Sequence, residues 1–126
     1  MKKGVKVVNE NGRRIVKGLG YFEPVYVSDC RELVKRSRQK YDSRVAFRFK
    51  KHGKVIEKTY IDLDNDIDAL GTALHDLGLK DKFISVISEN RYEWSVAYFS
   101  IINGTGVGVP LDKYLPKNEV ENLVTR

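Results

Sequence analysis

The sequence predicts an α/β protein in which β-hairpins precede a parallel βαβ unit flanked by helices. Two observations lead to this fold class. In the first 60 residues, short β-prone segments occur in pairs, and each pair is separated by a tight-turn sequence. From residue 61 onward, amphipathic and short apolar segments alternate in the order helix, strand, helix, strand, helix. Two buried strands that bracket a helix form the building block of a parallel sheet.

The first expected element is a small hairpin. Its strands are the apolar segments 5–8 and 15–16, and Asn11-Gly12 supplies a turn that tolerates positive φ. Gly18, Gly20 and Pro24 then interrupt regular structure. We therefore divide the chain into residues 1–28, a hairpin with a connector, and residues 29–126, which hold the remaining elements.

The first expected helix begins after Asp29, which is a suitable N-cap, with Glu32 three residues later as in a capping box. Its apolar stripe includes Cys30, which we expect in the core because no histidine lies near it in the sequence. Basic residues fall largely opposite this stripe and predict a solvated face. These residues are Lys35, Arg36, Arg38 and Lys40.

A second hairpin should span residues 45–60, with His52-Gly53 at its turn. A helix with a leucine-rich stripe follows and should end just before Gly78. Residues 83–87 form a nearly continuous apolar segment, which is typical of a strand buried on both faces. A helix over 93–103, a strand beginning at Val107, and a last helix with Pro116 at its first position complete the prediction.

Composition limits the classes of function. The 126 residues include 41% hydrophobic and 32% charged residues, which excludes intrinsic disorder. The single cysteine, Cys30, excludes an intramolecular disulfide and fits a reducing compartment. No apolar segment is long enough to span a membrane, and no secretory signal follows the first lysines. We therefore expect a cytoplasmic location.

The charge is unevenly distributed. Residues 1–60 carry a net charge of +11 and residues 61–126 a net charge of −5, within a total of +6. A basic half of this kind leaves a nucleic-acid-binding domain open as an alternative function. However, no zinc-finger spacing, aromatic strand signature or Gly-x-x-Gly clamp accompanies the charge. A solvated surface explains it more simply.

No motif forms a complete active site. The glycine-rich segment 104–108 lies between a helix and a strand and lacks the spacing of a dinucleotide or phosphate loop, so we expect tight packing there. The alternating aspartates Asp62, Asp64, Asp66 and Asp68 lack the glycine and glutamate of a calcium loop, and we expect them to stabilise a helix start. His52 and His75 lie on different elements and make no metal site. We assign no catalytic, cofactor-binding or metal residue.

Five segments in order resemble acyl-CoA synthetases of the adenylate-forming (AMP-binding) superfamily, and most closely bacterial long-chain fatty acid–CoA ligases. The segments are 33–41, 44–47, 59–63, 83–94, and 101–112 with Leu115-Pro116 and Glu119 after it. In this family, the matching segments are mainly framework of the large N-terminal domain, so the resemblance implies that residues 29–126 are an incomplete N-terminal subdomain of an AMP-binding enzyme. The resemblance therefore implies that Asn90, Trp94, Pro110 and Asp112 hold a turn and a strand exit in place. Arg91 is the one candidate for a peripheral ligand contact, because turns at strand ends line ligand crevices.

The resemblance also implies an activity for the parent protein. Such enzymes use ATP and Mg²⁺ to convert a long-chain fatty acid to an acyl-adenylate and then transfer the acyl group to coenzyme A. The motifs that bind these cofactors lie beyond residue 126, so the chain alone should be inactive, bind none of them and self-associate through uncovered strands. Long-chain substrates further imply peripheral contact with a membrane, for which the basic half is suited. A small interaction or assembly module is the alternative.

Overall fold

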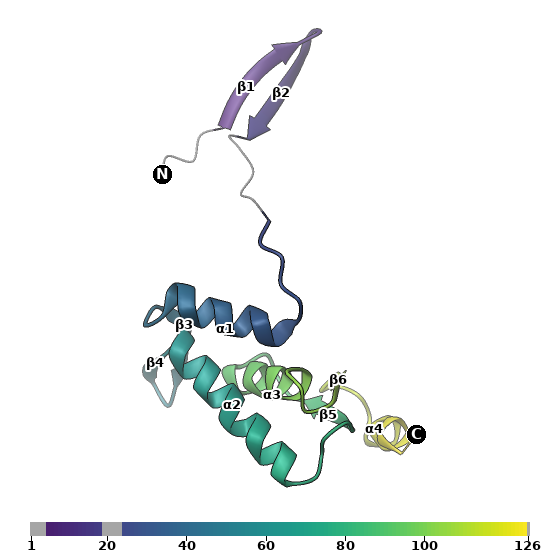
Figure 1. Cartoon of the computed structure of the whole chain (residues 1–126). Helices are drawn as coiled ribbons and strands as arrows, with labels where there is room; N and C mark the ends of the chain where they lie inside the picture. Colours follow the sequence, from purple (N-terminus) through teal and green to yellow (C-terminus); the bar gives the residue numbers. More distant parts are fainter. Residues whose placement is uncertain (1–4, 19–23, 126) are drawn as a thin grey trace.

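The computed structural model describes residues 5–18 and 24–125, and these confirm the predicted order of elements. The elements are β1 (Val5–Glu10), β2 (Arg13–Gly18), α1 (Cys30–Tyr41), β3 (Val45–Lys51), β4 (Lys54–Thr59), α2 (Tyr60–Asp76), β5 (Phe83–Ile87), α3 (Tyr92–Ile102), β6 (Val107–Leu111) and α4 (Lys117–Val124). Figure 1 shows α1, α2 and α3 packed together, with β3–β4 at one end of this helical layer and β5–β6 at the other.

Both predicted hairpins form with the predicted turns. Asn11 and Gly12 have φ values of 53° and 75°, and His52 and Gly53 have 49° and 77°. Positive φ at both central residues is the property of the type I′ turn, whose twist matches that of the paired strands. Each hairpin is antiparallel, and β3 contains a register shift between Val45 and Phe47.

Side-chain caps fix the starts of the first two helices. The Asp29 carboxylate accepts a hydrogen bond of 2.7 Å from the Glu32 amide, as the sequence predicts, whereas the Glu32 carboxylate accepts one from the Ser28 amide instead of the Asp29 amide. At α2, Thr59 and Asp62 form a reciprocal capping box. The predicted start of α4 is wrong by one residue, because Pro116 occupies the N-cap and the helix begins at Lys117.

The core lies where α3 meets α1, α2 and the second hairpin. Ile67 and Ile101 are each 2% exposed, and the ring of Tyr92 lies between Phe47 and Phe49. The buried side of α3 includes Tyr92 and Val96, which the sequence prediction had not placed there. Cys30 is only partly buried and lies outside this core, so its predicted core position is wrong.

β5 and β6 pair in parallel, as predicted, but they are not buried on both faces. Phe83 is 79% exposed and Ile87 is 46% exposed, while α3 covers the opposite face. The prediction failed because a two-stranded sheet covered by one helix leaves its other face open. Within residues 5–18 and 24–125, no further strand pairs with β5 or β6.

The glycines before β6 allow close packing, as predicted. A Cβ atom on Gly106 would lie 2.3 Å from the Lys82 carbonyl oxygen, and one on Gly108 would lie 3.1 Å from the Tyr98 ring. Gly104 has a φ of 118°, which an L side chain rarely adopts. This segment is therefore a packing device and not a phosphate loop.

The predicted solvated face of α1 is wrong at two positions. Lys35 and Arg38 point toward α2 and bind the carboxylate of Asp64, which has no exposed surface. Three of the four aspartates therefore serve contacts between elements: Asp64 and Asp68 bind α1, and Asp66 binds Lys58 and Tyr92. Only Asp62 caps its helix. None of the helices in the described segments is both long enough and apolar enough to cross a membrane.

Candidate functional site

The residues singled out by sequence come together at the carboxyl ends of β5 and β6. One hollow of about 370 Å³ there is lined by Ser88, Asn90, Trp94, Pro110 and Asp112. This is the edge at which open α/β sheets place ligands, because strand-end turns meet there. The predicted framework residues therefore share a single site, although they come from strand β6, helix α3 and the segments that follow β5 and β6.

An ion pair between Glu89 and Lys113 forms part of the lining of this hollow. Lys113, after β6, donates a hydrogen bond of 2.7 Å to Glu89, after β5. This hydrogen bond holds the pKa of the Glu89 carboxyl below its usual range. The Tyr114 amide donates to Asp112 at 2.9 Å, and the Lys113 ammonium lies 4.5 Å from the centre of the Tyr114 ring. The strand exit is thus held by contacts within the segment 112–114 and one bridge to the neighbouring turn.

Arg91 does not reach this hollow. Its guanidinium binds the Glu93 carboxylate through two hydrogen bonds of 2.9 and 3.1 Å, which lower the pKa of Glu93 to about 2. It lines a second hollow beside Phe47 and Phe49. Arg91 and Glu93 thus form an exposed ion pair at the start of α3, and the peripheral ligand contact of Arg91 stays a prediction.

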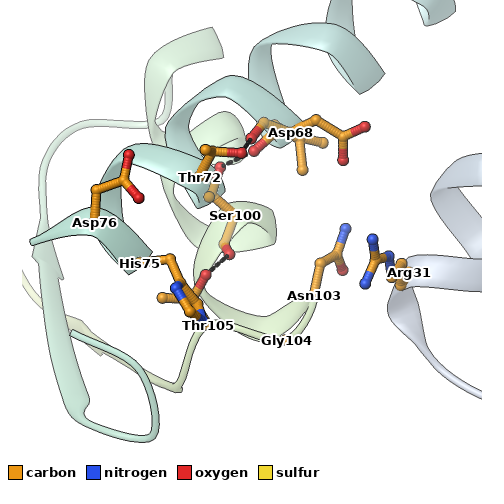
Figure 2. A pocket seen from close by; sticks show the side chains of 11 residues that line it. Arg31, Asp68, Thr72, His75, Asp76, Ser100, Asn103, Gly104 and Thr105 are labelled. Carbon is orange, nitrogen blue, oxygen red and sulfur yellow. Dashed lines mark hydrogen bonds between the residues drawn. The ribbon is translucent and has the colours of Figure 1, made fainter. Parts of the chain in front are cut away.

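A third hollow lies among α1, α2 and the end of α3 (Figure 2). It is a polar cavity of about 400 Å³. Sequence analysis missed it, because its wall joins Arg31 of α1, His75 of α2 and Asn103 after α3, which no local pattern connects. Figure 2 shows Arg31 and Asn103 facing each other. The Asn103 side-chain oxygen is buried and has no hydrogen-bond partner among residues 5–18 and 24–125.

The hydroxyl groups of this cavity are already used by the backbone. Thr72 donates to the Asp68 carbonyl at 2.8 Å, and Thr105 donates to the Ser100 carbonyl at 2.9 Å. No hydroxyl is hydrogen-bonded to His75 among the residues that the structure describes, so no nucleophile–base pair forms. The cavity is thus lined by polar side chains whose threonine hydroxyls bind carbonyl groups of the backbone.

The described residues contain no cluster of three or more metal-ligating side chains. The four aspartates illustrate the reason, since they bind cations and amides of the protein itself. The strand-end hollow is likewise lined by an internal ion pair and a capped turn. The cation and the turn carboxylate of this lining are thus already bound by other groups of the chain.

Comparison with known proteins identifies the architecture. The family model described as AMP-binding enzyme matches residues 34–126. The N-terminal subdomain of Klebsiella oxytoca NpsA in complex with 3-hydroxyanthranilyl-AMSN is 20% identical, with a TM-score of 0.68 over 79% of this chain and 25% of that one. IdnL1 is 17% identical, with a TM-score of 0.72 over 80% of this chain and 21% of that one.

A third similar structure is the anthranilate CoA ligase AuaEII in complex with anthranoyl-AMP. It is 18% identical, with a TM-score of 0.63, and the match covers 80% of this chain and 19% of that one. The chain thus spans between 19% and 25% of the length of these structures. Among curated proteins, no sequence matches it. The mixed α/β fold predicted from sequence is confirmed.

Proposed function

Because the chain belongs to the AMP-binding enzymes, we propose that it forms the first α/β layer of a ligase that activates a carboxylic acid with ATP. The match of the family model to residues 34–126 is the observation that carries this proposal. The fold supports it, because the same arrangement occurs in structures that contain an acyl-adenylate or its analogue. In this proposal, residues 29–126 belong to the N-terminal subdomain and residues 1–28 precede it.

The proposed acid is a long-chain fatty acid, and the proposed acceptor is coenzyme A. The resemblance of segments 83–94 and 101–112 to long-chain fatty acid–CoA ligases supports this choice. The similar structures name a different class of acid, since their ligands are 3-hydroxyanthranilyl-AMSN and anthranoyl-AMP. Aromatic acids are therefore the competing substrates that a test must include.

The residues of this chain act as framework in the proposed enzyme. Asn90, Trp94, Pro110 and Asp112 shape the strand-end hollow, and the Glu89–Lys113 pair fixes the distance between its two turns. ATP, Mg²⁺ and coenzyme A would be bound by other parts of the protein. The isolated 126-residue chain is then inactive, because electrostatic stabilisation of a phosphoryl group needs converging donors that these hollows lack.

Pyrophosphate release tests the proposal. The 126-residue chain, supplied with ATP, Mg²⁺, palmitate and coenzyme A, should release none above background. Protein made from the reading frame extended past codon 126 should release pyrophosphate with palmitate and form palmitoyl-CoA. If pyrophosphate release is faster with anthranilate than with palmitate, the fatty acid is not the substrate, but the proposal that the enzyme activates a carboxylic acid still holds. Robust release by the 126-residue chain would overturn its framework role, and a reading frame that stops at Arg126 would favour the interaction module.

A further inference from the structure

The β1–β2 hairpin is the one described element pair without a packing partner. Each of its strands packs substantially only against the other, and Figure 1 shows the hairpin set apart from the helical layer. All of its residues are exposed except Val8 and Ile15, which are half-buried. A two-stranded hairpin in water buries too little apolar surface to be more than marginally stable. A surface that covers it would therefore also stabilise it.

One face of this hairpin carries three exposed valines. In the observed register, Val7 lies directly opposite Val16, and Val5 follows on the same face because side chains alternate along a strand. The exposed fractions of these side chains are 64% for Val5, 48% for Val7 and 64% for Val16. The three valines form a continuous exposed strip, which soluble surfaces usually cover.

The hairpin is also strongly cationic. Residues 5–18 contain one carboxylate, that of Glu10, and four basic side chains, those of Lys6, Arg13, Arg14 and Lys17. In the observed register, Arg14 lies on the face of the three valines, and the other cations lie on the opposite face with the half-buried Val8 and Ile15. Lys17 binds Glu10, and this is the only ion pair of the hairpin within the described residues. Lys6 lies directly opposite Lys17, and like charges in that position repel. An anionic partner would relieve this repulsion, so the charge of the hairpin indicates what covers it.

We propose that the β1–β2 hairpin is a docking arm for an anionic lipid surface. The valine strip enters the interface, and the long basic side chains reach the headgroups while their stems stay against apolar surface. Nucleic acid fits less well, because residues 5–18 contain no aromatic side chain on which a base could stack. This inference is independent of the proposed ligase activity, since its test involves neither ATP nor an acid substrate.

Vesicle co-sedimentation of the 126-residue chain tests the charge requirement. The chain should bind vesicles of phosphatidylglycerol with phosphatidylcholine and leave phosphatidylcholine vesicles unbound. The variant R13E/R14E should bind about 25-fold more weakly or worse, because each cation near an anionic leaflet contributes a factor of about five. The matched control K50E/K54E changes net charge equally beside the other type I′ turn and should bind as the parent does. Equal losses in both variants would overturn the proposal.

A second measurement does not depend on how the charge-reversed hairpin folds. A polarity-sensitive dye is attached to E10C or, separately, to K51C, each in the C30S background; both positions end the strand before a turn. Anionic vesicles should shift the emission at position 10 to the blue and leave position 51 unchanged. V7S/V16S should abolish this shift at low salt, because the valine strip is lost. Shifts of equal size at both positions, or binding of a DNA oligonucleotide in place of vesicles, would contradict the proposal.

Discussion

Arg38 on α1 donates a hydrogen bond of 2.5 Å to Asp64 on α2, and this carboxylate has no exposed surface. Lys35 lies one helical turn earlier and binds the other Asp64 oxygen at 2.9 Å. Burial alone would raise the pKa of Asp64, but the hydrogen bonds from Arg38 and Lys35 outweigh it and hold the pKa below its usual range. The contact between α1 and α2 thus includes one buried charge with two cationic partners.

Replacing the two cations should therefore lower the free energy of unfolding more than replacing the carboxylate does. In D64N, Lys35 and Arg38 can turn to water, because about a third or more of each side chain is exposed, and we expect a loss of about 2 kcal/mol. In K35M/R38M, Asp64 remains buried without its partners, and we expect a loss of about 4 kcal/mol. Urea unfolding followed by far-UV circular dichroism measures both. K40M, on the exposed side of α1, is the control, and equal losses in the two variants would contradict this account.

The same carboxylate should make stability depend on pH in the acid range. Because the pKa of Asp64 is lower in the folded than in the unfolded state, its contribution is complete above the unfolded-state value of about 4 and is lost as the pH falls through the folded value. The free energy of unfolding of the parent chain should thus fall more steeply below pH 4 than that of D64N. Urea titrations at a series of pH values give both curves, and parallel curves would exclude Asp64 as a contributor.

Local chemistry was predictable from the sequence, and contacts between elements were not. Asn11-Gly12 and His52-Gly53 predicted their turns because positive φ is a property of the residues themselves. Asp29 predicted a helix start for a similar reason, since its carboxylate caps an amide three residues away. Such signals act within four residues and need no knowledge of the fold.

The role of Lys35 and Arg38 was not predictable in this way. Periodicity placed them on the polar face of α1, but it could not show that this face meets a buried aspartate 26 residues after Arg38. The cavity of Figure 2 was not predictable for the same reason, because the packing of α1 near the end of α3 brings together Arg31 of α1 and Asn103, the residue that follows α3. The strand-end hollow was accessible to sequence reasoning only through the resemblance to a family.

The close approach before β6 predicts a large effect from one methyl group. In G106A, the new Cβ would lie 2.3 Å from the Lys82 carbonyl oxygen, and a backbone atom cannot move aside as a side chain can. We expect the free energy of unfolding to fall by about 3 kcal/mol. G18A is the matched control, since its Cβ meets nothing within 4 Å, and its effect should stay within about 0.5 kcal/mol. Thermal unfolding compares the two, and a stable G106A would show that the β5–β6 junction can adjust.

The open face of the parallel pair predicts that the 126-residue chain self-associates. Phe83 lies directly opposite Val107, and the two side chains are 79% and 49% exposed on adjacent strands whose outer edges have no partner in the described residues. Apolar faces and free strand edges of this kind pair with other chains. Sedimentation velocity at micromolar concentrations should detect dimers or larger species, and F83E should shift the distribution toward monomer. V55E, at a 57% exposed valine of β4, should leave it unchanged. A parent chain that stays monomeric would contradict this prediction, because the exposed face of β5 and β6 would then be stable in water without a partner.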